Sequence, residues 1–254
     1  MPKSLWAPAG GETWRINPQY HFRGEIETVS QNDIEKIWKS SNILHVFISH
    51  KSNVSHRAQK VKSLLSEYGI SCFVAHEDIE PAMEWQSVIE KALFSSDSLI
   101  ALICKEFSSS KWTDQEVGIA IGRQIPVFPI KLDEDADLTG FIGKIQAFRR
   151  NKDVIQNLLE QFILDTRTTS ATISSLLQAL QQTGDIDKIA CALAILEKAP
   201  STAWKTTQKE AFLSLYNEKA DVKTMEISRK ILDDINPEGV RESLESDFDD
   251  NTPF

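Results

Sequence analysis

Long apolar runs and a secretory leader are the first features that this sequence of 254 residues lacks. No stretch approaches the roughly 18 uncharged apolar residues that a membrane-spanning helix requires. The N-terminal segment MPKSLWAPAGGETWR also lacks the apolar run of a signal peptide. We therefore expect a cytoplasmic protein with no membrane partner.

Cysteine is scarce, and the three cysteines form no metal-binding pattern. Cys72, Cys104 and Cys191 each lie in an apolar stretch, and no CxxC motif or Cys/His cluster accompanies them. Protein metal sites need clusters of such ligands at characteristic spacings. The sequence predicts three buried free thiols and no metal.

Positive charge is also in deficit, because 28 Lys and Arg face 37 Asp and Glu and the net charge is -9. Binding to nucleic acid or anionic lipid relies on clustered basic side chains, and the basic residues here are scattered along the chain. A GxGxxG motif after a strand and a P-loop are missing too. These absences argue against a nucleic-acid partner, a Rossmann dehydrogenase and a nucleoside triphosphatase.

What the sequence does contain is an alternation of apolar strands and amphipathic helices. Strands are expected in five places: 43–49, 70–75, 98–104, 125–132 and near 144–148. The three longest runs are continuously apolar, as in strands buried on both faces. Residues 55–69 and 85–94 have apolar side chains at helical spacing, with Gly69 as a C-cap. The pattern predicts an α/β fold with a doubly wound, parallel, five-stranded sheet.

The chain changes character after about residue 150, because five helical stretches follow and no strand signal remains. The first of them closes the α/β domain, and the others form a helical bundle with an acidic tail. We predict an N-terminal segment 1–42 with a short helix around QNDIEKIW, an α/β domain 43–167 and a helical domain 168–254. The N-terminal segment is expected to dock on the core of its own chain or on another chain.

Four stretches carry a family resemblance: NILHVFISHKS, YGISCFVAHEDIEPAMEWQSVIEKALFSSDSLIALI, SSSKWTDQEVGIAIGRQIPVFPI and GFIGKIQAF. In this order and spacing they resemble a prokaryotic TIR (Toll/interleukin-1 receptor-like) domain of the NAD-cleaving type. The resemblance covers residues 43–150 and a closing helix that ends near residue 166. It implies a flavodoxin-like sheet and, in many members, cleavage of NAD at the bond between nicotinamide and ribose.

The resemblance also implies roles for particular residues. The catalytic glutamate of such domains lies just inside the helix after the third strand, four residues after an aromatic position, which here gives Glu116 and Trp112. A loop after the second strand, residues 76–85 here, reaches toward a neighbouring protomer in assembled members. Many bacterial members carry an acid in an SSKD pattern after the first strand, where this chain has KSNVS. That departure leaves no carboxylate at Asn53.

The expected sheet order independently indicates a ligand site in the region of Glu116. In a sheet of order 2-1-3-4-5, ligands bind where the order reverses, at the carboxyl ends of strands one and three. Those ends are residues 49–53 and 105–113, so we expect the two stretches to converge on one crevice with Glu116 at its rim. The helix start near Asn53 would offer backbone amides to a pyrophosphate.

A single carboxylate suits the cleavage of NAD. Nicotinamide is already a cationic leaving group, so no second carboxyl is needed as a general acid. Glu116 would stabilise or trap the oxocarbenium-like ribose, and a position in the first helical turn would favour its ionised form. Trp112, on the same helix face, would offer an aromatic wall to a planar ring.

A purely structural role for Glu116 is also compatible with the motif TDQE. Thr113 and Glu116 in TDQE match the capping-box pattern, in which the glutamate only bonds back to the amide of Thr113. The sequence alone therefore leaves both a catalytic and a capping hypothesis for this glutamate.

Other candidates lie at the ends of the first two strands and at the next helix. Ser49, His50 and Ser52 are candidate substrate-binding residues, although serine near a helix start is ordinarily a cap and His50 is equally compatible with a structural role. His76 and Trp85 are better explained as structural, Trp85 as the first residue of an amphipathic stripe.

We therefore expect an NAD+ glycohydrolase or cyclase-type TIR effector, a hydrolase of bacterial anti-phage immunity, with NAD as its substrate and no cofactor. Its expected contacts are self-association through TIR domains and an activating protein partner at the helical domain. The alternative is a non-catalytic TIR module that signals by self-association, with Glu116 as a cap. A base-removing hydrolase or transferase acting on nucleosides would use the same glutamate.

Overall fold

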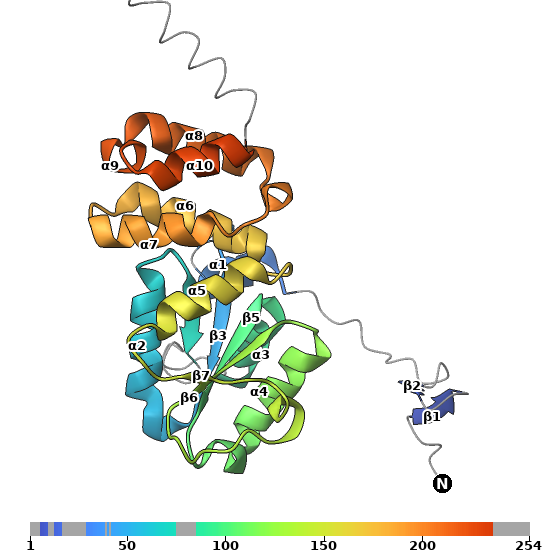
Figure 1. The fold of residues 1–254 in the computed structure, drawn as a ribbon. Helices are drawn as coiled ribbons and strands as arrows, with labels where there is room; N and C mark the ends of the chain where they lie inside the picture. The colour runs from blue at the N-terminus through green and yellow to red at the C-terminus, as the bar shows by residue number, and fades with distance from the viewer. Residues whose placement is uncertain are drawn as a thin grey trace, which may run out of the picture.

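The computed structural model describes residues 6–9, 13–16, 29–38, 40, 42–74 and 85–235. Its centre is a parallel sheet in the order β4-β3-β5-β6-β7 (Figure 1). The strands are β3 His45–Ser49, β4 Ser71–Val74, β5 Ser98–Ile103, β6 Val127–Lys131 and β7 Phe148–Arg149. In chain order this is the 2-1-3-4-5 arrangement, so the predicted α/β fold class is confirmed.

The two central strands form the middle of the hydrophobic core. Every residue of β3 and β5 is buried, because helices cover both faces of a parallel sheet and leave no solvated side. The edge strand β7 has only two residues, Phe148 and Arg149, which explains why its sequence signal was the weakest of the five. It begins at the last residue of the predicted run 144–148.

Four helices flank the sheet in two pairs. They are α2 Ser55–Ser66, α3 Trp85–Ser95, α4 Lys111–Gly122 and α5 Val154–Leu164. Helix α2 packs beside α5 and α3 packs beside α4, and the two pairs cover opposite faces (Figure 1). This gives the doubly wound arrangement that the alternation of strands and helices predicts.

The predicted short helix before the sheet is present as α1, Gln31–Trp38, and it docks on its own chain. Lys91 Nζ on α3 lies 3.1 Å from Asp33 Oδ1, and Trp38 Nε1 donates a 2.8 Å hydrogen bond to Ser95 Oγ. The buried Trp38 ring also stacks on His45, with ring centroids 4.6 Å apart. For this helix, the hypothesis of docking on the chain's own core is confirmed.

A strand pair earlier in the chain was not predicted. Strand β1, Trp6–Ala9, pairs antiparallel with β2, Thr13–Ile16. The signal that could have found it is the Gly-Gly pair at positions 10 and 11 between two short runs with aromatic residues, since such a dipeptide favours a hairpin turn.

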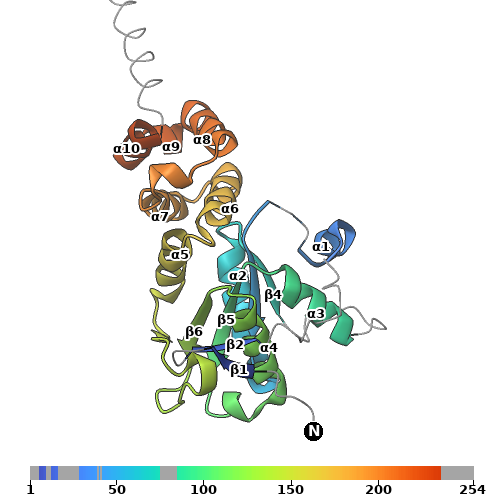
Figure 2. The ribbon, with the colours of Figure 1, turned by 90° about the vertical axis from the view of Figure 1, so that its right-hand side faces the viewer.

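The described chain after residue 153 is helical, as predicted. Beyond α5 come α6 Thr169–Gln182, α7 Ile186–Leu196, α8 Thr206–Glu218, α9 Ala220–Lys223 and α10 Glu226–Ile235. This bundle lies beyond the amino ends of the strands (Figures 1 and 2). The carboxyl ends of the strands, at the opposite edge of the sheet, point away from the bundle.

Contacts just before two strands attach the bundle to this amino edge. The backbone amide of Leu44, immediately before β3, donates a 2.9 Å hydrogen bond to Ser175 Oγ on α6. Gly69, two residues before β4, has φ +73°, and a Cβ there would lie 2.1 Å from the backbone oxygen of Ser175. Only glycine permits both this backbone conformation and this close approach.

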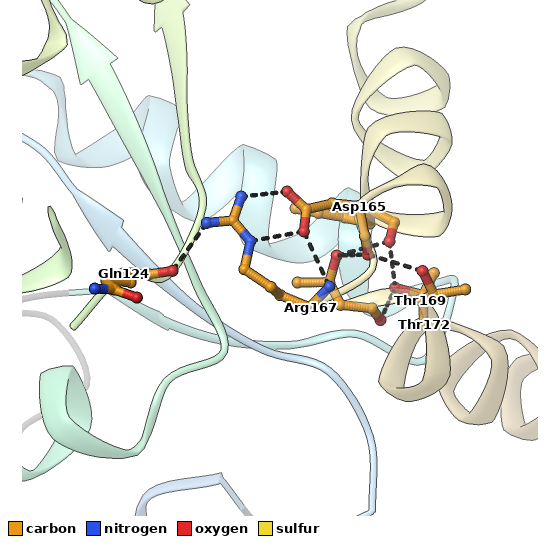
Figure 3. Close-up of polar contacts among 7 residues, drawn as sticks. Gln124, Asp165, Arg167, Thr169 and Thr172 are labelled. Atoms are coloured by element: carbon orange, nitrogen blue, oxygen red, sulfur yellow. Dashed lines mark hydrogen bonds and ion pairs between the residues drawn. The ribbon is translucent and has the colours of Figure 1, made fainter. Parts of the chain in front are cut away.

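A third attachment comes from the connection between α5 and α6 (Figure 3). The Arg167 guanidinium lies between the Asp165 carboxylate and the backbone of Gln124, to whose carbonyl oxygen its Nη1 donates at 2.8 Å. Asp165 Oδ1 accepts a 2.8 Å hydrogen bond from Arg167 Nε. The buried core continues from the sheet into the bundle, so the domain boundary at residues 167 and 168 stays a prediction.

Within the described ranges, no helix is long and apolar enough to cross a membrane. The cysteine prediction holds in part. Cys72 and Cys104 are buried, and Cys191 is only half-buried; none of the three is in a disulfide within the described part of the chain.

Candidate functional site

The carboxyl ends of β3 and β5 meet at one edge of the sheet, as their order requires. The two strands pair directly, with Ser49 opposite Ala101. Beyond them, Lys51 Nζ forms a 3.0 Å ion pair with Glu106 Oε2. Asn53 Nδ2 donates a 3.2 Å hydrogen bond to the same oxygen. The stretches 49–53 and 105–113, which the sequence predicts to converge, are therefore in contact.

Glu116 and Ser49 form the buried centre of this region. Ser49, the last residue of β3, donates a hydrogen bond from Oγ to Glu116 Oε2 at 2.5 Å. Ser49 has no exposed surface and Glu116 is only 2% exposed. The glutamate side chain thus points from α4 toward the carboxyl end of β3 and away from bulk solvent. The prediction that Glu116 lies at the rim of a crevice is therefore wrong, because the side chain is buried.

The start of α4 rules out the capping-box hypothesis for Glu116. The helix begins at Lys111, and its N-cap is Ser110, whose side chain accepts from the amide of Thr113. The Thr113 hydroxyl donates to the Phe107 carbonyl at 2.7 Å and to the Ser110 carbonyl at 3.0 Å. Glu116 is therefore the sixth residue of the helix, and its carboxylate bonds to Ser49 instead of to the Thr113 amide.

The same helix start corrects the expected electrostatics of Glu116. A carboxylate in the first turn would gain from the helix dipole, but this effect fades beyond that turn. Burial dominates instead and raises the pKa of Glu116 to about 7, although the hydrogen bond from Ser49 acts in the lowering direction. Near neutral pH the side chain exists in both charge states.

The other predicted site residues differ in their access to solvent. His50 is buried, with Nδ1 3.4 Å from the Ile48 carbonyl oxygen. Ser52 is exposed in a short 3-10 helix, Ser52–Val54, that leads into α2. Trp112 lies in the first turn of α4 and is 37% exposed, unlike the buried Glu116 one turn later.

Two features that the sequence predicts lie wholly or partly outside the described residues. His76 and the rest of the self-association loop 76–85 up to residue 84 lie outside the described residues, and so does the side chain of Trp85. The backbone of Trp85 starts α3, which is the helix start that the sequence predicts.

Glu106 is a residue of this region that the sequence reading missed. It follows β5 and supplies the carboxylate that contacts both Lys51 and Asn53 after β3. Its only sequence signal is an acid shortly after a buried strand. It places a negative charge beside Asn53.

The candidate site joins side chains of β3 and α4. Among the residues that the structure describes, no group of three or more His, Cys, Asp or Glu side chains could hold a metal ion. What the site does offer is one buried carboxyl that titrates near neutral pH, a serine hydroxyl bonded to it, and an aromatic ring at the surface of the same helix.

Comparison with known proteins gives one family match. Residues 46–162 match the family model described as the TIR domain. Among solved structures, the chain is similar to the TIR domain of the Toll-related receptor TRR-2 from Hydra magnipapillata, with 18% sequence identity and a TM-score of 0.38. The similarity covers 48% of this chain and 96% of that one. A search of the curated proteins found no match.

Proposed function

We propose that the protein cleaves NAD between nicotinamide and ribose, with Glu116 as the catalytic residue, because residues 46–162 match the family model of the TIR domain. Glu116 occupies the position that the family resemblance implies for the catalytic glutamate, four residues after Trp112. The proposal concerns the α/β part of the chain, and the match leaves the helical bundle outside it.

The burial of Glu116 beside Ser49 is the observation that carries this proposal. A helix cap would sit at the solvent-exposed start of α4, whereas this carboxyl lies at the carboxyl end of β3, where the strand order reverses. Ligands of such sheets bind at that point. A carboxyl with a strongly perturbed pKa at such a place is a candidate functional group, because structural roles seldom require a charge in a buried position.

The proposed chemistry needs the ionised form of Glu116. As the bond to nicotinamide breaks, positive charge develops on the ribose, and a carboxylate in a region of low dielectric stabilises it strongly. The Ser49 hydroxyl donates to one carboxylate oxygen and so holds the side chain in orientation. We expect the exposed Trp112 ring to contact a planar part of the substrate.

The direct test is to incubate the purified full chain with NAD and to measure free nicotinamide by chromatography. Release of nicotinamide with multiple turnovers supports the proposal. If none is released at any protein concentration, including concentrations at which the chain self-associates, the catalytic proposal fails.

A second candidate is a non-catalytic TIR module that acts by self-association. The 2% exposure of Glu116 favours it, because a carboxyl so well covered can also serve only to tie α4 to β3. The two candidates differ in one measurement. A catalytic domain releases nicotinamide, whereas a binding module forms oligomers in sizing experiments without any turnover.

The proposed role in bacterial immunity rests on the family resemblance. Cleavage of NAD would either deplete the cofactor or produce a linear or cyclic ADP-ribose signal, and a requirement for self-association would keep the monomer inactive until a trigger arrives. The helical bundle is the proposed element for sensing or assembly. Steep loss of specific activity on dilution supports control by assembly, and constant activity in the monomer range contradicts it.

A further inference from the structure

A second feature of the carboxyl edge lies beyond the residues considered for NAD cleavage. A pocket of about 700 Å³ opens where β6 and β7 end. Its lining includes Lys131, Arg149 and Arg150, together with the carboxylate of Glu134. The basic residues are scattered along the sequence, but the fold brings three of them together in this pocket.

The register of the sheet makes this grouping unusual. Lys131 on β6 and Arg149 on β7 are direct partners in the parallel ladder. Paired residues point to the same face, so two positive side chains stand next to one another. Like charges at directly opposite positions destabilise a sheet, so the pair does not contribute favourably to folding.

Nearby acids do not remove this positive charge by pairing with it. Lys131, Arg149 and Arg150 make no ion pair within the part of the chain that the structure describes. Asp135 pairs with Lys105 at 2.6 Å, and this hydrogen bond and, more weakly, the charge of Lys131 lower its pKa. Asp133 accepts a hydrogen bond from the backbone amide of Lys105. Glu134 is then the one carboxylate that lines the pocket itself.

We propose that this pocket binds the phosphate of a small phosphorylated ligand. Two guanidinium groups beside an ammonium group match an anion with more than one negative charge, because each arginine can donate two parallel hydrogen bonds to phosphate oxygens. A bound phosphate also offsets the repulsion between Lys131 and Arg149. The proposal does not depend on cleavage of NAD.

The test is isothermal titration of the full chain with sodium pyrophosphate. The matched variants are Arg149→Gln/Arg150→Gln, which removes two lining charges, and Arg229→Gln, which removes one exposed charge on α10, outside this pocket. We expect binding near one pyrophosphate per chain, at least a tenfold loss of affinity in the double variant and unchanged affinity in Arg229→Gln. The absence of binding to the parent, or equal affinity in the double variant, overturns the proposal.

Thermal unfolding separates a binding role from a structural one. Without ligand, Arg149→Gln should unfold at or above the melting temperature of the parent, because the repulsion with Lys131 is gone. With pyrophosphate, the parent should gain stability and the variant should not. If the arginine variants do not fold, Lys131→Met provides the same comparison, since it keeps the aliphatic stem. An equal gain in the parent and in the charge-removing variant contradicts the proposed site.

The phosphate could belong to NAD itself or to a separate ligand. NAD is titrated into the Glu116→Gln chain with and without saturating pyrophosphate, so that no turnover is involved. Displacement of NAD assigns the pocket to the pyrophosphate of the substrate, and simultaneous binding assigns it to an independent ligand. Both results retain the phosphate site, whereas pyrophosphate binding that survives loss of both arginines rejects it.

Discussion

Ser49 Oγ and Glu116 Oε2 lie 2.5 Å apart although 67 positions separate the two residues in the chain. The bond joins the end of β3 to the second turn of α4, and both side chains are buried. Burial raises the pKa of this carboxyl and the hydrogen bond from Ser49 lowers it, so the charge state of Glu116 depends on both.

Glu116→Gln should reduce nicotinamide release by a factor on the order of a hundred or more, because the amide carries no charge to stabilise the ribosyl cation. Glutamine keeps the size of the side chain and can still accept from Ser49. The measurement is the rate at saturating NAD in a variant whose circular dichroism matches the parent. Turnover at the parental rate would return Glu116 to a structural role.

The stability of the Glu116→Gln variant should depend on pH in a defined direction. The folded pKa is raised from 4.5 to about 7, so the folded state retains a proton that the unfolded state has lost. The parent therefore loses stability as pH rises from about 4.5 through about 7, by about 3 kcal/mol at most. The variant should match the parent near pH 4 and exceed it at pH 8. Denaturant unfolding at both values tests this, and a difference that does not change with pH contradicts the raised pKa.

The activity should depend on the same titration of Glu116, but it should rise over the pH range in which the stability falls. If the reaction uses ionised Glu116, kcat/KM should rise with pH and reach half of its plateau at about 7. Ser49→Ala removes a hydrogen bond that lowers this pKa, so its midpoint should move to higher pH. Ser52→Ala, at an exposed neighbouring serine, is the control and should leave the midpoint unchanged. A Ser49→Ala profile that coincides with the parental one would show that the bond does not tune the carboxyl.

Trp112→Ala should mainly weaken substrate binding. The ring is 37% exposed, so its removal should change the free energy of unfolding by no more than about 1 kcal/mol. A rise in KM on the order of tenfold with a smaller change in kcat is the expected result. Steady-state kinetics with NAD measures both constants, and unchanged KM would place the ring outside the binding region.

Gly69→Ala should weaken the attachment of the bundle. The residue has φ +73°, and its new Cβ would lie 2.1 Å from the Ser175 backbone oxygen, which cannot move without shifting α6. The expected loss is more than about 2 kcal/mol of unfolding free energy. Gly122→Ala, in a helix with nothing within 4 Å of its new Cβ, should instead stabilise by about 0.5–1 kcal/mol. Equal stability of the two variants would contradict the close approach to Ser175.

The sequence predicted the sheet and its reversal point well, because buried parallel strands are continuous apolar runs and their connections follow topological rules. It placed the start of α4 wrongly, since Ser110 and Thr113 are both good caps three residues apart. The choice between them depends on the Phe107 carbonyl, which accepts from the Thr113 hydroxyl in the folded state. A local pattern cannot contain that tertiary contact.

The sequence did not predict the basic cluster around Lys131 and Arg149 for a similar reason. Lys131 and Arg149 are far apart in the chain, and only the register of a two-residue strand brings them opposite one another. The sequence also did not predict that the bundle packs at the amino edge of the sheet. Apolar helix faces predict that α6 and α7 are covered, but they do not say by which surface.

The position of α4 gives the molecule a mechanical property. Ser110 caps the helix at the carboxyl edge, and beyond its last turn the carbonyl of Gln124 accepts from Arg167 at the amino edge. At about 1.5 Å per residue, Glu116 and Gly122 are separated by about 9 Å along a continuous helix. An α-helix shortens little under load, so it acts as a strut between the two edges.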